Sequence, residues 1–214
     1  MKLQLGCGQR YFEGYVNIDY PLSEHSVQQT SVADTFADLT ELYYKPKSIE
    51  EVRLHHVFEH FTRATACALL TSWSSWLVDN GVLHIEVPDF QRSGKVALSR
   101  FSSEKERAVA IRHIFGSQEA HWAVHYEGYT SETLSHLLNL YGFKTDKLIK
   151  NSHLGTYNIE VIARKAEDKT MSDFYAITEK YLRNFMVVDV ESERILFSTW
   201  MNEYTNQVDK TIAR

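Results

Sequence analysis

Lys2-Leu3-Gln4-Leu5-Gly6-Cys7-Gly8, followed closely by Gly14-Tyr15-Val16-Asn17-Ile18-Asp19, is the stretch that decides the fold of this 214-residue chain. In each segment a short apolar run, typical of a strand, ends in a polar or glycine-rich loop. Gly6 and Gly8 have no Cβ atom, so the backbone can turn sharply and let a ligand lie directly against it. The pair alone is a weak signal, because ordinary turns also use it.

Asp19 stands at the end of the second strand, where its carboxylate can accept hydrogen bonds from both hydroxyls of a ribose. NAD-binding domains use the same arrangement, so Asp19 indicates a nucleoside without choosing the cofactor. The dinucleotide fingerprint has a third glycine three positions after the second, and Tyr11 stands there instead. This difference disfavours NAD. The alternative interpretation of Asp19, taken without the other elements, is a surface turn residue.

Strands and helices alternate through the middle of the chain, which predicts a parallel α/β sheet. One helix is expected to begin at Thr62, whose hydroxyl can cap it, and to stop at Asn80-Gly81. A loop rich in histidine and aromatic residues is expected over 121–129, where periodicity is lost. A second capped helix should run from Thr130 to Gly142. The remaining expected elements are strands at 31–39 (weak), 51–55, 82–87, 143–149 and 157–163, and a helix at 103–115.

From Ala166 onward the sequence is polar and helical, which predicts a main domain over 1–165 and a C-terminal helical extension over 166–214. Two apolar stripes recur there at helical spacing. They must be buried against the main domain or against a second copy of the chain, so a homodimer through these helices is one of two expected arrangements.

The composition indicates which binding partners and which cellular compartment the sequence favours. A net charge of -5 and the absence of a dense Lys/Arg block predict no nucleic-acid partner. No segment approaches the roughly 20 apolar residues that span a bilayer, and the N-terminus lacks the apolar stretch of a secretory signal. Cys7 and Cys67 form no CxxC pair, so no disulfide framework is expected and the sequence favours a cytoplasmic location.

Four blocks together resemble the class I, Rossmann-like S-adenosylmethionine-dependent methyltransferases, in particular a bacterial branch of small, type 11-like methyltransferases. The blocks are 2–8, 14–19, 56–61 (His-Val-Phe-Glu-His-Phe) and 81–90 (Gly-Val-Leu-His-Ile-Glu-Val-Pro-Asp-Phe). The resemblance covers roughly residues 1–165 and implies a three-layer sandwich around a mostly parallel, seven-stranded sheet. The crossover from Gly8 to Asp19 is shorter than the dozen or more residues that a parallel crossover normally takes. We therefore expect a stub in place of the first helix, with the pocket partly open there or covered by Tyr11 and Phe12.

The resemblance also implies roles for individual residues. Those expected to bind S-adenosylmethionine are Gly6, Cys7 and Gly8 at the methionine end, Asp19 at the ribose, Asp38 and Leu39 at the adenine, and His55 and His56 near the sulfonium. Glu59-His60 opens the helix that follows and is expected to shape the pocket, with His60 as a substrate-binding residue. Many relatives have an acidic residue where Gln4 stands and Pro-Gly-Gly where Asp79-Asn80-Gly81 stands, which weakens the match.

Methyl transfer from a sulfonium is an in-line displacement that needs no metal, and positioning can supply on the order of 7–11 kcal/mol. The expected acceptor is a small-molecule or glycan hydroxyl. His125 is the candidate base, worth roughly 10²–10⁴-fold in rate, with His121 as a weaker candidate. Tyr126 and Tyr129 are expected to contact the substrate, although aromatic residues there can equally well cover the sheet edge.

Three other functions fit the sequence less well. A metallohydrolase is disfavoured because His121 and His125, four residues apart, lie in no HExxH motif, so no metal site is predicted. A catalytically inactive protein on the same fold would bind the cofactor or a partner, with the C-terminal helices as its docking surface. An NAD-dependent oxidoreductase is the third alternative, and Tyr11 weakens it.

Overall fold

The computed structural model describes residues 1–24 and 30–212. Its centre is a seven-stranded sheet with the order β3-β2-β1-β4-β5-β7-β6. Strands β1 to β5 pair in parallel, whereas β7 lies antiparallel to both β5 and β6. The strands are β1 (Lys2–Leu5), β2 (Val16–Asp19), β3 (Thr35–Phe36), β4 (Ile49–His55), β5 (Leu77–Pro88), β6 (Phe143–His153) and β7 (Thr156–Lys165). The predicted α/β class and the seven-stranded, mostly parallel sheet are confirmed.

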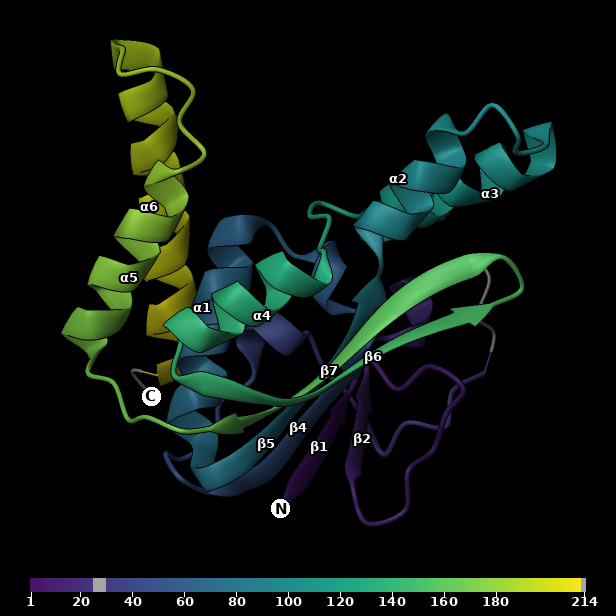
Figure 1. Cartoon of the computed structure of the whole chain (residues 1–214). Helices are drawn as coiled ribbons and strands as arrows, with labels where there is room; N and C mark the ends of the chain where they lie inside the picture. Colours follow the sequence, from purple (N-terminus) through teal and green to yellow (C-terminus); the bar gives the residue numbers. More distant parts are fainter. Residues whose placement is uncertain (25–29, 213–214) are drawn as a thin grey trace.

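The helices fall into a group beside the sheet and a pair beyond the end of β5 (Figure 1). The first group is α1 (Arg63–Trp76), α4 (Ser131–Leu140), α5 (Met171–Arg183) and α6 (Glu191–Ile212). The pair beyond β5 is α2 (Phe90–Leu98) and α3 (Glu104–Phe115). Three short 3-10 helices are η1 (Leu22–Glu24), η2 (Leu39–Glu41) and η3 (Phe58–His60).

Most of the expected helix starts are confirmed by their caps. The hydroxyl of Thr62 accepts a hydrogen bond from the N–H of Thr65, and Thr130 accepts one from Thr133, so both helices begin where predicted. Ser103 caps α3 in the same way. The hairpin of β6 and β7 is also confirmed, with β6 at the edge of the sheet.

Two expectations about local structure were wrong. The helix from Thr62 ends at Trp76 and not at Asn80-Gly81, because β5 already begins at Leu77. Asn80 does take a left-handed conformation, with φ 61°, but it does so inside the strand, near the register shift between β4 and β5. Helix α2, capped by Asp89, was not predicted. The expected strand over 31–39 shrinks to β3, because Leu39 enters η2 instead.

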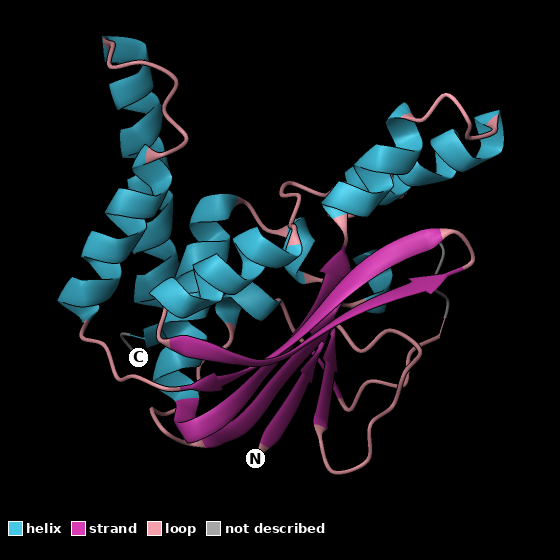
Figure 2. Cartoon of the chain, in the orientation of Figure 1, coloured by secondary structure: helices cyan, strands magenta, loops and turns pink. Residues whose placement is uncertain are grey.

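The two faces of the sheet differ in chemistry. One face carries fully buried rows in register, such as Leu3, Val52 and Leu83, and shares one core cluster with α1. The next row, of Gln4 and Arg53 and then His84, points to the opposite face. Figure 2 shows helices beside the sheet on one side and loops on the other.

The predicted stub crossover explains this asymmetry. Residues 6–15, all of which are described, form no helix between β1 and β2. The second face is covered there by a loop, in which the Phe12 ring lies 4.7 Å from the Arg53 guanidinium. Of the two expected arrangements, a cover formed by Tyr11 and Phe12 is not observed: Phe12 packs on the sheet, Tyr11 is 57% exposed, and neither lines the cavity.

Helices α5 and α6 bury most of their apolar stripes against the main domain, although Leu196 in α6 stays 41% exposed. The hydroxyls of Thr71 in α1 and Tyr204 in α6 lie 3.1 Å apart, and those of Ser72 and Thr211 lie 2.6 Å apart, both pairs buried. The buried part of the stripes is therefore covered by the main domain within one chain. The boundary at residue 165 and a homodimer both stay predictions. Within the described residues, no helix has the length and hydropathy to cross a membrane.

Candidate active site

A cavity of about 830 Å³ opens at the carboxyl ends of β1, β2 and β4, the edge at which open α/β sheets bind ligands. It brings together residues from distant parts of the sequence. Among its lining are the predicted cofactor residues Gly6, Gly8, Asp19, Asp38, Leu39, His55 and His56, and also His60. Of the residues expected to hold the cofactor, Cys7 alone has no place in that lining.

The glycine loop forms the floor of this cavity through its backbone shape. Gly6 and Gly8 have φ of 68° and 55°, and a Cβ atom on Gly6 would lie 2.3 Å from Cγ2 of Val57. The N–H groups of Gly6 and Cys7 both donate to the carbonyl of Ile18, at 2.9 and 3.0 Å. Burial raises the pKa of the Cys7 thiol to about 11, so this side chain is a neutral, buried support.

Asp19 and η2 form the opposite wall. Asp19 is 5% exposed, and its Oδ1 accepts the N–H of Tyr20 at 3.0 Å. Asp38 caps η2 by accepting the N–H of Thr40 at 2.8 Å, which leaves buried Leu39 as an apolar surface in the cavity. A flat purine fits between such apolar surfaces, with a carboxylate beside it for a ribose.

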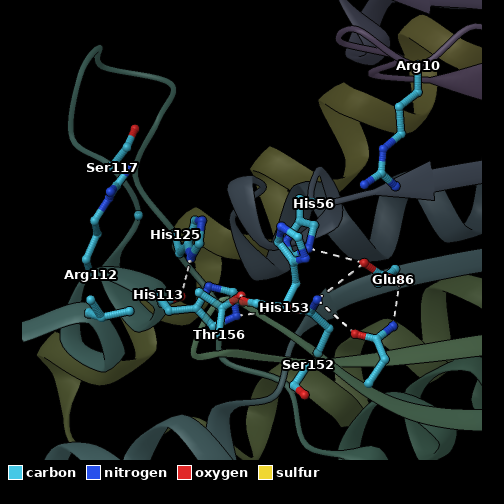
Figure 3. A pocket seen from close by; sticks show the side chains of 14 residues that line it. Arg10, His56, Glu86, Arg112, His113, Ser117, His125, Ser152, His153 and Thr156 are labelled. Carbon is cyan, nitrogen blue, oxygen red and sulfur yellow. Dashed lines mark hydrogen bonds and ion pairs between the residues drawn. The ribbon is translucent and has the colours of Figure 1, made fainter. Parts of the chain in front are cut away.

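A second cavity, of about 630 Å³, is lined by the side chains that Figure 3 shows. Its lining includes His125 from the loop of residues 121–129, His113 from α3 and Glu86 near the end of β5. His56 is the residue that lines both cavities. Two ligands, one in each cavity, would therefore approach each other at His56. A group transfer between two bound molecules needs such an arrangement.

His56 is held between two carboxylates. Its backbone has φ 55°, and its Nδ1 and Nε2 lie 3.3 Å from Glu59 Oε1 and 3.3 Å from Glu86 Oε1. Burial opposes the charged form, but these two carboxylates outweigh it and raise the pKa of His56 to about 9. Burial likewise opposes the charge on Glu86, yet hydrogen bonds from His56 and Asn151 lower its pKa to about 2. The imidazolium and Glu86 are thus both charged at neutral pH.

The loop of residues 121–129, called the aromatic loop, is held against η3 by hydrogen bonds to main-chain carbonyls. The carbonyl of Glu59 accepts the N–H of Tyr126 at 2.9 Å, and Nδ1 of His60 donates to the carbonyl of Val124 at 3.1 Å. Nδ1 of His125 donates to the carbonyl of His113 at 3.1 Å. This leaves the lone pair of His125 on Nε2, and burial lowers the pKa of this imidazole, so it is neutral and able to accept a proton.

Some of the predicted substrate residues lie elsewhere. His121 is exposed and lines neither cavity, and Tyr126 is 54% exposed and also outside both. Tyr129 is 3% exposed and stacks on Phe58, with ring centroids 5.3 Å apart. The expectation that Tyr129 contacts the substrate is wrong, because its position just before α4 turns the ring into the core.

Several lining residues were not predicted from the sequence. Trp122 lies over the first cavity, where its Nε1 donates to the carbonyl of Glu24 at 2.8 Å and its ring approaches Tyr20. Glu86 was not expected to be a site residue, although a carboxylate inside the apolar strand of 82–87 was a usable signal. His113 gave no signal, because its role depends on how α3 folds back on β7.

Comparisons with known proteins agree with this fold. No protein-family model matches the chain, and no curated protein matches it. A solved S-adenosylmethionine-dependent methyltransferase from Methanosarcina mazei is similar over 78% of this chain and 92% of its own, at 12% identity and a TM-score of 0.51. A Burkholderia thailandensis 1,6-didemethyltoxoflavin-N1-methyltransferase, with its substrate and S-adenosylhomocysteine bound, covers 78% of this chain and 71% of its own, at 16% identity and a TM-score of 0.50. At these identities the likeness shows the fold, which is that of class I methyltransferases.

Proposed function

We propose that the protein is an S-adenosylmethionine-dependent methyltransferase whose acceptor is a small-molecule or glycan hydroxyl. The observation that carries this proposal is the pair of cavities that meet at His56, one of them lined by seven of the eight residues expected to hold the cofactor. The two solved structures compared above are described as methyltransferases, and one contains S-adenosylhomocysteine. We also propose a cytoplasmic location, because Cys7 and Cys67 are free thiols.

The residues of the first cavity fit this cofactor. The sharp turn at Gly6, packed on Val57, leaves the backbone open to a ligand, and Asp19 supplies carboxylate oxygens for a ribose. Leu39 provides an apolar surface for the adenine, and His55 and His56 lie at the end of β4, on the side of the second cavity. When bound, S-adenosylmethionine supplies an activated methyl group on its sulfonium.

We propose the second cavity as the acceptor site and His125 as the base. The carbonyl of His113 holds the His125 ring in one orientation, with the Nε2 lone pair available. Nε2 can therefore take the hydroxyl proton as the acceptor oxygen attacks the methyl carbon. His60 stacks edge-on against His125, with ring centroids 4.7 Å apart, and so supports the base from the cofactor side.

The alternatives lose support from the structure. An NAD enzyme places a pyrophosphate on the helix that follows the glycine loop, and residues 6–15 form no helix here. The inactive alternative uses the C-terminal helices for docking, but the C-terminal half of α6 is buried on α1. An inactive protein also has no need of a neutral, oriented imidazole beside the cofactor cavity.

Calorimetry tests the proposal in two steps. Titration with S-adenosylmethionine and with NAD should show one site that prefers S-adenosylmethionine. A panel of hydroxylated small molecules and sugars, followed by release of S-adenosylhomocysteine, then tests turnover. Preference for NAD would refute the proposal, whereas tight cofactor binding with no turnover on any acceptor would favour the inactive alternative.

A further inference from the structure

We propose that Glu59, His60 and His125 form a binding site for a divalent transition-metal ion, located between the two cavities. The ligand atoms that these three side chains can offer lie within 4.8 Å of one another. His60 lines the cofactor cavity and His125 lines the acceptor cavity. This site goes beyond the proposed function and departs from the expectation, drawn from the sequence, that no metal is bound.

The hydrogen bonds of the two histidines define which nitrogen faces the site. Nδ1 of His60 donates to the carbonyl of Val124, and Nδ1 of His125 donates to the carbonyl of His113, each at 3.1 Å. In the neutral form, each ring therefore carries its lone pair on Nε2. Metal-binding histidines are held in the same way, with the second nitrogen donating to a carbonyl or carboxylate that fixes the tautomer.

Glu59 supplies the third ligand and an independent sign of a cation site. Its side chain is 1% exposed, so the carboxylate is enclosed by protein. Oε1 is bonded to His56, but Oε2 is buried without any hydrogen-bond partner. A buried carboxylate oxygen with no partner is costly, and a bound cation would remove that cost.

The ligand atoms of Glu59, His60 and His125 face one another, and none of the three is a hydrogen-bond donor. Nε2 of His125 lies 3.9 Å from Oε1 of Glu59, and both atoms present lone pairs. Tetrahedral zinc, with bonds of about 2.0–2.2 Å, holds its ligand atoms roughly 3.3–3.5 Å apart, so a contraction of well under ~1 Å per side chain completes the site. Two imidazoles and one carboxylate suit Zn²⁺, Co²⁺ or Fe²⁺ and not the all-oxygen preference of Mg²⁺ or Ca²⁺.

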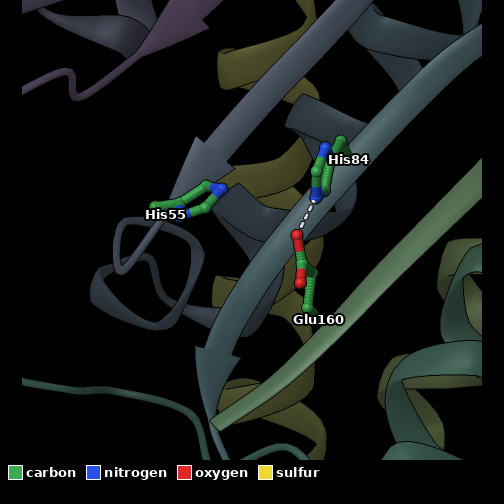
Figure 4. Close-up of side chains that lie close together, drawn as sticks. All are labelled: His55, His84 and Glu160. Atoms are coloured by element: carbon green, nitrogen blue, oxygen red, sulfur yellow. Dashed lines mark hydrogen bonds and ion pairs between the residues drawn. The ribbon is translucent and has the colours of Figure 1, made fainter. Parts of the chain in front are cut away.

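A second cluster of similar composition, His55, His84 and Glu160, is less suited to a metal ion (Figure 4). The guanidinium of Arg53 donates to Nδ1 of His84, so the ring proton must be on Nε2, which donates to Glu160. Both nitrogens of His84 are thus used within a chain of hydrogen bonds. A metal ion at Nε2 would need an imidazole with no proton at all beside an arginine.

Occupancy of the proposed site has a chemical consequence. A bound ion would occupy the Nε2 lone pair of His125. His125 can therefore act as a base only in the protein that has no ion bound. An ion that binds three protein ligands keeps at least one open position, and that position would lie beside both cavities. A hydroxyl bound there would have its pKa lowered by the ion and could release its proton to water.

Metal binding can be measured without cofactor or acceptor, so the test is separate from that of the proposed function. Chelator-treated full-length protein is titrated calorimetrically with Zn²⁺, and the visible spectrum is recorded with Co²⁺. We expect one equivalent to bind and a spectrum typical of a four-coordinate nitrogen and oxygen site. His60→Ala and His125→Ala should each weaken binding by about 100-fold or more, since even residues that only orient ligands contribute 10–100-fold.

Matched variants separate this site from metal binding elsewhere on the protein. His136→Ala removes an exposed histidine, and Glu160→Gln breaks the second cluster, so both should bind Zn²⁺ as the wild type does. Glu59→Gln should also lose the ion. Because Glu59 is buried, the melting temperature of this variant is measured first. If the variant is unfolded, the two histidine variants decide the outcome. Zn²⁺ affinity that is unchanged in the His60→Ala, His125→Ala double variant would overturn the proposal, as would loss of binding in Glu160→Gln.

Discussion

Asp19→Ala is the substitution with the most direct effect on the proposed cofactor site. The carboxylate is 5% exposed, lies at the end of β2 and lines the cofactor cavity. In the proposed complex it accepts hydrogen bonds from the ribose, and hydrogen bonds to a charged group contribute about 1.5–3 kcal/mol. At 1.4 kcal/mol for each factor of ten, the variant should bind S-adenosylhomocysteine about 10- to 150-fold more weakly.

The assay is calorimetric titration of the wild type and Asp19→Ala with S-adenosylhomocysteine, alongside thermal melting. Asp209→Ala is the matched control, since it removes an exposed aspartate from α6 and should leave the affinity unchanged. The variant loses the bond from the Tyr20 N–H as well, so a small drop in melting temperature is expected. Equal affinity in a folded Asp19→Ala variant would show that the ribose is held elsewhere, and the assignment of the cavity would be wrong.

Further substitutions test the base, the glycine loop, the buried carboxylate and the C-terminal helices. His125→Ala should leave S-adenosylhomocysteine affinity unchanged and slow turnover by about 10²–10⁴-fold; normal single-turnover rates would exclude His125 as the base. Gly6→Ala should destabilise the protein by more than about 1–2 kcal/mol in urea unfolding, because φ is 68° and the new Cβ meets Val57, and Val57→Ala should restore part of the loss. Glu86 has its pKa lowered from 4.5 to about 2, so its charge stabilises the fold by about 3 kcal/mol above pH 4.5, and this stabilisation is lost as the pH falls toward 2. Glu86→Gln should therefore reduce the loss of unfolding free energy between pH 4.5 and 2, and an unchanged loss would refute the assignment. Truncation after Lys165 should lower the melting temperature sharply, because it uncovers α1, and a truncated chain as stable as the whole would show that 166–214 is dispensable.

The sequence predicted the parts of the fold that depend on local patterns. The strands ending at Gly6 and Asp19, and the caps at Thr62 and Thr130, follow from short-range chemistry and are confirmed. The predicted end of α1 was wrong because Asn80-Gly81 can end a helix and can equally form a turn inside a strand. Local sequence could not distinguish these two uses, since pairing with β4 decides between them.

The candidate site was predicted unevenly for a related reason. Cofactor residues stand at strand ends, and the carboxyl ends of parallel strands meet at one edge, so Asp19 and His56 could be placed from the sequence. The acceptor side depends on how the loop of 121–129 docks on η3, which no periodicity encodes. His125 was therefore named from its residue type and lies in the second cavity, whereas Tyr129 lies in the core and His113 was not predicted.

A crystal structure of the protein with S-adenosylhomocysteine bound would decide whether the larger cavity holds the cofactor. We predict that the ribose hydroxyls bind the Asp19 carboxylate, that the adenine lies on Leu39, and that the sulfur points past His56 toward the cavity lined by His125. A ligand bound away from the Gly6 loop, or a sulfur that faces away from that cavity, would contradict the proposed methyltransferase site.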